Sequence, residues 1–337
     1  MIAYYAHSHG NGHFNTAQLF TQKICPDTII LTAAHKSGAN IVKINDEDTT
    51  AVEYKNVIVN LPVYAHYLPK SNRKIVCRTK QIIDAIVEYN ITVACIDVSV
   101  ETAIVFRIAS IPYGYNVLVG NRNDIAHQIA FEAADFLYSF LPEIFFKNQK
   151  EELKSKTFYL GFHSRFAFRN NDITTSNIDL KNKRILVICG KGGTLINNRL
   201  ISKISSAIPA CSLHIAGSFD NISPENEKLC LGFINDIEYV ISESDVVISS
   251  CGLNLTSEIL AIKNKFLAIA EERPYEEQKI MQDILVKHQL AIAFDENNIE
   301  KCIRDVLRLQ PSSHLQDWFC DTKSTKKFKQ KIKSYEE

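Results

Sequence analysis

Two glycine-rich turns stand at matching places in the two halves of the chain, and each follows a short apolar run. The first turn (residues 6–13, AHSHGNGH) follows MIAYY, and the second (residues 189–194, CGKGGT) follows RILVI. Stretches with helical amphipathicity come next, at residues 16–23 and 196–208. A strand that turns directly into a helix presents backbone N–H groups and the positive end of the helix dipole, and glycine lets a phosphate approach them. The pattern predicts two nucleotide-binding-like domains with a ligand between them.

The size and composition of the chain fit two globular domains. Its 337 residues are many for one domain and suit two. The hydrophobic fraction of 46% and the charged fraction of 23% are ordinary for a soluble protein. Because the formal net charge is zero, the composition gives no indication of a nucleic-acid partner.

Cysteine usage and apolar run lengths indicate the compartment. The nine cysteines include no CxxC pair and several lie inside apolar runs, which favours buried free thiols over a disulfide framework or a zinc site. The N-terminus has no basic region followed by an apolar core, and no apolar stretch approaches bilayer length. We therefore expect a cytoplasmic protein.

Strand-like and helix-like segments alternate in both halves, which predicts parallel sheets with helices on both faces. In the first half we expect strands at residues 28–33, 57–61, 92–98, 113–117 and 136–139, and helices at 78–89, 99–109 and 125–134. In the second half we expect strands at residues 184–189, 212–216, 228–232, 246–249, 265–270 and 291–294, and helices at 196–208, 234–242, 254–261 and 276–287.

A polar, Asn-rich stretch interrupts this alternation and suggests a linker. We therefore predict an N-terminal domain over residues 1–165, a linker over 166–182, a C-terminal domain over 183–312 and a terminal helix or basic tail over 313–337. The Lys-rich tail has two interpretations, a solvated terminal helix or a contact with lipid headgroups.

The stretch SDVVISSCGLNLTSE (residues 244–258), followed by FLAIA (266–270) and EEQ (276–278), resembles the donor-binding domain of GT-B glycosyltransferases. It is similar to the enzymes that add N-acetylglucosamine to the lipid-linked peptidoglycan precursor, and to the nucleotide-sugar hydrolases of pseudaminic acid synthesis. Both glycine turns and this motif fall in the family's order, so the resemblance covers most of the chain. It implies an α/β fold of two doubly wound, Rossmann-like domains facing across a cleft.

The resemblance implies a donor site in the second half. The helix from Asn254 would present its N-terminal amides to a diphosphate. Glu258 matches the glutamate that accepts the ribose hydroxyls, the other interpretation being a solvent-exposed helix glutamate. The implied donor and nucleotide residues are Gly12, Gly190, Lys191, Gly192, Gly193, Thr194, Phe233, Ile234, Cys251, Gly252, Leu253, Asn254, Leu255, Thr256, Glu258 and Gln278.

Several of these donor residues have a second interpretation. Lys191 is either an anion contact or an exposed lysine. Phe233 and Ile234 either hold the nucleobase through backbone groups or pack. Gln278 either lies near the donor sugar or is an ordinary surface glutamine.

His13 is the residue that we expect to carry the chemistry. An imidazole suits a base that takes a proton from a hydroxyl near neutral pH, and the matching histidine of the family lies at the cleft. Asp97 ends a buried strand, where it either orients His13 or caps the helix from Ser99. On the acceptor side we expect His9, Arg122 and His127, the alternative being a loop capped by Asp124.

No metal or other cofactor is expected. The acidic run Asp46-Glu47-Asp48 lies in a polar loop of the other domain and is interpreted as solvated. The resemblance implies that helix dipoles and backbone amides stabilise the departing diphosphate in place of a metal.

These observations predict an inverting glycosyltransferase that moves a sugar from a UDP-linked donor to a hydroxyl of a glycan or lipid-linked acceptor. The resemblance implies a role in bacterial cell-surface glycan synthesis, with peripheral contact at the inner face of the membrane. Two alternatives stay open: a nucleotide-sugar hydrolase of the pseudaminic-acid type, and a non-catalytic domain that binds a nucleotide sugar. The EEQ segment favours transfer over hydrolysis.

Overall fold

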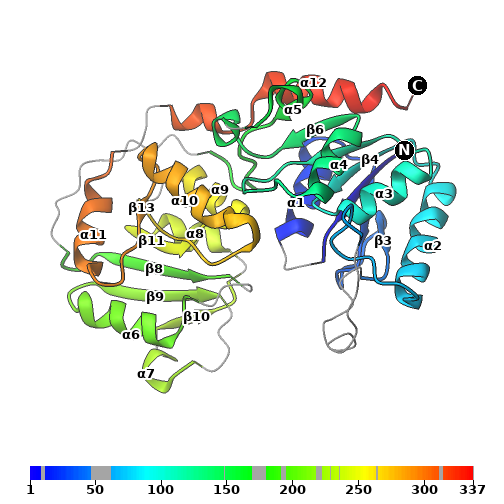
Figure 1. Ribbon diagram of the computed structural model, residues 1–337. Helices are drawn as coiled ribbons and strands as arrows, with labels where there is room; N and C mark the ends of the chain where they lie inside the picture. Colours follow the sequence, from blue (N-terminus) through cyan, green and yellow to red (C-terminus); the bar gives the residue numbers. More distant parts are fainter. Residues whose placement is uncertain are drawn as a thin grey trace. The chain divides into compact units, whose positions relative to one another are not determined.

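The chain forms two compact units (Figure 1). Unit 1 contains Met1–Leu118, Arg122–Gly161 and Cys320–Glu337, and unit 2 contains Val119–Asn121 and Phe162–Phe319. The computed structural model describes residues 1–8, 12–46, 62–147, 149–168, 180–190, 195–217, 222–227, 229–234, 236–262, 265–310 and 314–336.

Unit 1 is built on a parallel sheet with the strand order β3-β2-β1-β4-β5-β6-β7. The strands are β1 (Ile2–Ala6), β2 (Thr28–Thr32), β3 (Ile41–Lys43), β4 (Val93–Asp97), β5 (Tyr113–Asn116), β6 (Phe136–Ser139) and β7 (Thr157–Tyr159). The helices are α1 (Gly12–Lys23), α2 (Arg73–Glu88), α3 (Val100–Ile108), α4 (Ile125–Ala133), α5 (Glu151–Ser155) and the 3-10 turn η1 (Glu143–Phe146). Every residue of β1, β2 and β4 is buried, as expected for strands covered on both faces.

Unit 2 repeats this plan with the strand order β10-β9-β8-β11-β12-β13, again parallel. The strands are β8 (Arg184–Cys189), β9 (Ser212–Gly217), β10 (Cys230–Gly232), β11 (Val246–Ser250), β12 (Lys265–Ile269) and β13 (Ile292–Ala293). The helices are α6 (Asn198–Ala207), α7 (Pro224–Glu227), α8 (Ile237–Ser242), α9 (Leu253–Ala261), α10 (Glu277–Lys287) and α11 (Ile299–Arg308), with 3-10 turns η2 (Pro274–Glu276) and η3 (Leu315–Trp318).

The core of unit 2 shows why these segments fold together. Ile201 and Ile204 of α6 and Ile303 of α11 belong to one buried cluster with the inner residues of the central strands, such as Val187 and Ile248. The apolar residues of both helices recur at helical spacing, so each helix buries one stripe and leaves its charged face in water. Strands β8 and β12 are apolar except for their first residues, Arg184 and Lys265.

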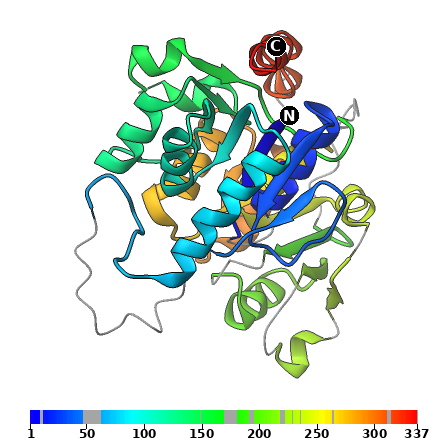
Figure 2. The ribbon, with the colours of Figure 1, turned by 90° about the vertical axis from the view of Figure 1, so that its right-hand side faces the viewer.

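The C-terminal helix α12 (Thr322–Lys333) belongs to unit 1. Figure 1 draws it in red, and Figure 2 shows it end-on. Asp321 caps its first turn, and Phe328 is fully buried. The ring of Phe328 lies against four aromatic rings, those of Phe20, Phe136, Tyr138 and Phe158. The Lys-rich tail is therefore a helix with one buried apolar face, and not a wholly solvated one.

The predicted α/β class of two doubly wound parallel units is confirmed. The expected strand at residues 57–61 lies outside the described residues, as does most of the expected linker. The edge strands β3 and β7 and the helices α5 and α11 had not been expected. No helix in the described residues has the length and apolar character needed to span a bilayer.

Candidate functional site

In unit 1, the order in which successive strands are added to the sheet reverses between β1 and β4. Strands β2 and β3 follow β1 on one side, and β4 continues on the other, with Tyr5 opposite Ile96. In open α/β sheets, ligands bind at the carboxyl ends of the strands at this switch point. Two predicted site residues lie there: Asp97 is the last residue of β4, and His13 lies in the first turn of α1.

His13 and Asp97 form a hydrogen-bonded pair. The Nδ1 atom of His13 lies 2.7 Å from Oδ2 of Asp97, whose carboxylate is 1% exposed. The other oxygen, Oδ1, accepts a hydrogen bond of 2.8 Å from Nδ2 of Asn116, the last residue of β5. A buried carboxylate at Nδ1 favours the tautomer with its proton on Nδ1, so the lone pair of the ring is on Nε2. This is the arrangement of a histidine that acts as a base through Nε2.

The backbone next to Asp97 is strained. Val98 has a φ of 61°, a left-handed conformation that a β-branched residue rarely adopts. Ser99 then caps α3, its hydroxyl accepting a hydrogen bond from the amide of Thr102. The N-cap of α3 is therefore Ser99, so the interpretation of Asp97 as the helix cap is wrong. The sharp turn at Val98 leaves the Asp97 carboxylate directed at His13.

The rest of the first glycine turn is described in part. Gly12 is the first residue of α1, while His9 lies outside the described residues. The ring of His7 lies 5.6 Å from that of His13. Ser8 donates a hydrogen bond of 2.7 Å to Asp46, so this acid is engaged with the turn and is not merely solvated.

Unit 2 has its own switch point, between β8 and β11, where Ile188 lies opposite Ser249. Gly190 follows β8, and Gly252 follows β11 and is the N-cap of α9. A Cβ added at either glycine would meet no atom within 4 Å. The Cβ positions of Gly190 and Gly252 therefore face open space. Lys191, Gly192, Gly193 and Thr194 lie outside the described residues.

The first turn of α9 offers backbone amides. Gly252, Leu253, Asn254 and Leu255 are partly exposed, whereas Cys251 and the helix from Thr256 onward are buried. The N-cap residue, Gly252, has no side chain that could cap this turn. Backbone N–H groups at the positive end of a helix dipole attract anions. The arrangement suits a phosphate, as the sequence predicted for this segment.

Glu258 is buried in α9 and paired with Arg165. Its side chain is 9% exposed, and Oε1 accepts a hydrogen bond of 2.7 Å from Nε of Arg165. Burial raises the pKa of the Glu258 carboxyl, and the hydrogen bond from Arg165 partly offsets this rise. The interpretation of Glu258 as a solvent-exposed glutamate is wrong. Arg165 had not been expected at the site.

Gln278 is also buried, which excludes an ordinary surface glutamine. Its Oε1 accepts a hydrogen bond of 3.0 Å from the backbone amide of Glu271, just after β12. The Glu271 carboxylate in turn accepts the amide of Leu195 at 3.2 Å, where the chain leaves the second glycine turn. Glu271 therefore ties the end of that turn to the segment after β12. Sequence reasoning did not single it out.

Phe233 and Ile234 follow β10 and lie at the surface. Phe233 is 74% exposed, so its side chain has no packing role within the described residues. Ile234 is partly exposed.

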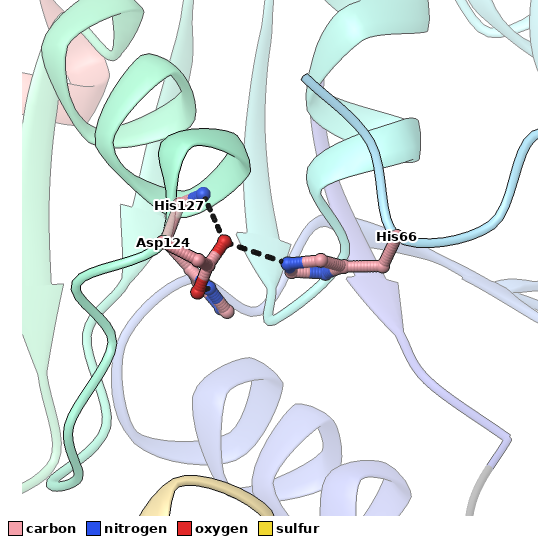
Figure 3. Close-up of side chains that lie close together, drawn as sticks. All are labelled: His66, Asp124 and His127. Atoms are coloured by element: carbon pink, nitrogen blue, oxygen red, sulfur yellow. Dashed lines mark hydrogen bonds and ion pairs between the residues drawn. The ribbon is translucent and has the colours of Figure 1, made fainter. Parts of the chain in front are cut away.

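The acceptor-side residues lie at the start of α4. Asp124 is the N-cap of α4, as the capped-loop interpretation predicted, and its Oδ1 accepts the amide of His127 at 3.1 Å. His127 is buried, and its ring nitrogen Nδ1 lies 2.6 Å from Oδ2 of Asp124. His66, from the loop before α2, contacts the same carboxylate (Figure 3). The backbone oxygen of Arg122 accepts a hydrogen bond from Gln128.

Comparison with known proteins identifies the fold. No protein-family profile and no curated protein sequence matches the chain. Among solved structures it resembles the glycotransferase of kitacinnamycin, with 10% identity over 99% of this chain and 98% of that one and a TM-score of 0.62. MurG of Acinetobacter baumannii matches at 12% identity over 99% of both chains, with a TM-score of 0.58. A UDP-glucosyltransferase from Polygonum tinctorium matches at 12% identity over 100% and 98%, with a TM-score of 0.61.

The fold is that of the GT-B glycosyltransferases. The matches run over the whole chain, so both units take part in the likeness. At identities near 10% the likeness concerns the fold, and the chemistry has to be argued from the site itself.

Proposed function

We propose that this protein is an inverting glycosyltransferase that transfers a sugar from a UDP-linked donor to a hydroxyl group. The observation that carries the proposal is the His13–Asp97 pair at the switch point of unit 1. Further support comes from the glycine-capped first turn of α9 at the equivalent point of unit 2. Solved structures of the same fold include complexes with UDP, and a rhamnosyltransferase, SpnG, with thymidine diphosphate.

In the proposed reaction, Nε2 of His13 takes the proton of the acceptor hydroxyl as its oxygen attacks the anomeric carbon. The bond from that carbon to the diphosphate oxygen breaks, and the nucleoside diphosphate leaves with the electron pair. Asp97 stabilises the imidazolium that forms, since its carboxylate is buried against Nδ1. Attack opposite to the leaving group inverts the configuration of the sugar.

The donor would be held by unit 2. The amides of Leu253, Asn254 and Leu255 would bind the diphosphate and stabilise its charge as it departs, so the transfer needs no metal. Glu258 would accept the ribose hydroxyls, and Phe233 and Ile234 would lie beside the base. Gln278, which fixes the loop after β12, would support the sugar subsite. The acceptor is a glycan or a lipid-linked glycan, with His9, Arg122 and His127 on its side.

The test is release of nucleoside diphosphate from a panel of UDP-, dTDP- and GDP-sugars, with and without acceptor extracts. Release that depends on an acceptor supports transfer, while release in buffer alone identifies a hydrolase. Binding without release in any arm identifies a non-catalytic nucleotide-sugar domain.

His13→Ala should lower turnover by about 10²–10⁴-fold, the usual contribution of a general base, while nucleotide affinity stays nearly intact. His314→Ala, at an exposed histidine of unit 2, is the control. A His13→Ala protein that melts normally and turns over at the native rate would refute the general-base role.

A further inference from the structure

The side chain of His66 meets those of Asp124 and His127, more than fifty residues later in the sequence, at the start of α4 (Figure 3). The Nε2 atom of His66 lies 2.9 Å from Oδ1 of Asp124, and Nδ1 of His127 lies 2.6 Å from Oδ2 of the same carboxylate. The ring centroids of the two histidines are 4.6 Å apart. One nitrogen of each ring and a carboxylate oxygen all lie within 4.8 Å of one another. Two imidazole nitrogens and a carboxylate oxygen therefore lie close enough together to bind one ion.

The surrounding structure fixes each of the three groups. His66 sits in a loop whose backbone is anchored by Glu101, which accepts the amides of His66 at 2.6 Å and Tyr67 at 2.7 Å. Asp124 is held as the N-cap of α4. His127 is 2% exposed, and its ring packs against Phe131 one turn later in α4. A cluster in which every member is positioned from outside is preorganised for a ligand.

We propose that His66, Asp124 and His127 form a binding site for a divalent transition metal, for which Zn²⁺ is the best match. Zinc takes imidazole nitrogen and carboxylate oxygen, and sites with three protein ligands leave a fourth position for water. In a tetrahedral site the ligand atoms lie about 3.4 Å apart, so small side-chain movements suffice from the present spacing. Two imidazoles with one carboxylate also discriminate against Mg²⁺ and Ca²⁺, which prefer oxygen ligands.

The nearby positive charge of Arg122 opposes cation binding. Its guanidinium interacts electrostatically with His127, so it would also repel a metal ion held by that ring.

A bound metal would join the loop of His66 to α4 inside unit 1. Its role would be to fasten this loop, and no step of the proposed sugar transfer passes through it. The inference goes beyond the proposed function, and its test measures metal binding and stability instead of turnover.

The experiment is titration of the metal-free, untagged protein with Zn²⁺ by calorimetry in a thiol-free reductant, paired with thermal melting. We expect one tight site and a raised melting temperature. His66→Asn and His127→Gln should each weaken zinc binding by about 100-fold or more. Substituting a residue that only hydrogen-bonds to a metal ligand already lowers metal affinity by about 10–100-fold, and these two residues would bind the metal directly. Asp124→Asn, which retains an N-cap side chain, should also weaken binding. Arg122→Gln should instead tighten it.

The matched control is His314→Asn. His314 and Asp317 are also a histidine and an aspartate three residues apart, but they lie on an exposed turn, with Nδ1 of His314 3.3 Å from the carboxylate. Because this pair is not part of the proposed site, the variant should bind zinc as the native protein does. Co²⁺ gives an independent readout, because a thiolate ligand produces an intense near-ultraviolet band that this site would lack. Zinc binding that is unchanged in His66→Asn and His127→Gln, or a cobalt spectrum with the thiolate band, would overturn the proposal. So would absence of binding to the native protein.

Discussion

Glu258 combines burial, a raised pKa and a cationic partner, Arg165. A carboxylate inside a helix is costly to desolvate, and one well-placed guanidinium compensates for it only in part. Such a group is held ready for hydrogen-bond donors that a ligand supplies. The ribose hydroxyls of a nucleotide are donors of this kind.

Glu258→Ala should weaken UDP affinity by about tenfold or more, because a charge-assisted hydrogen bond is worth roughly 1.5–3 kcal/mol. Calorimetric titration with UDP measures the affinity of the native and Glu258→Ala proteins. Glu243→Ala is the control, since Glu243 forms a similar ion pair with Arg184 on the surface of unit 2. Equal affinities of the native and Glu258→Ala proteins would remove Glu258 from the nucleotide site.

At the residue scale, the sequence points to those residues of the proposed site that stand beside a turn or a strand end, such as His13, Asp97 and Gly252. Arg165 and His66 are not found in this way, because their partners lie far along the chain and no spacing rule joins residues 165 and 258 or 66 and 124. Only the folded sheet brings these pairs together.

At the element scale, the central strands are the best predicted, since they are continuous apolar runs between turn residues. Strand β6 and strand β8 have the predicted limits, and β4 differs by one residue at each end. The edge strands β3 and β7 have only three residues each and are partly exposed, so neither stands out in the sequence as a long apolar run. Helix α11 was not predicted, because charged residues interrupt its buried apolar stripe in the sequence.

The attachment of α12 to unit 1 leads to a stability prediction. Phe328→Ala should destabilise unit 1 by about 3–5 kcal/mol, because it empties the centre of an aromatic cluster. Lys327→Ala, on the exposed face of the same helix, should have little effect. Urea unfolding followed by circular dichroism measures the loss. Trp318, the one tryptophan of the chain, belongs to unit 2 and reports on that unit separately.

An equal loss of stability in Phe328→Ala and Lys327→Ala would contradict the packing of α12 described above. A loss seen only in the fluorescence of Trp318 would mean that the helix stabilises unit 2 instead.

At the scale of the whole molecule, the two units repeat one device. In each unit, a glycine turn follows the first strand in the sequence. A second set of functional groups follows the neighbouring strand on the other side of the switch point, which is β4 in unit 1 and β11 in unit 2. In unit 1 these groups are His13 and Asp97, which suit proton transfer. In unit 2 they are Gly190 and the amides after Gly252, which suit a phosphate. In the proposed function, one topology would serve two kinds of chemistry because the residues at the strand ends differ.

This division of labour predicts where a nucleotide acts and what it requires. UDP in the presence of EDTA should raise the melting temperature, because the phosphate site consists of backbone amides; at 100 times its Kd a ligand contributes about 2.7 kcal/mol. Hydrogen exchange should slow at Leu253, Asn254 and Leu255, and α1 should change little. His13→Ala should retain the full shift in melting temperature, while Glu258→Ala, with an affinity about tenfold lower, should lose about half of it at the same UDP concentration. A shift that appears only with added divalent metal, or protection confined to unit 1, would show that the donor site is not the one proposed.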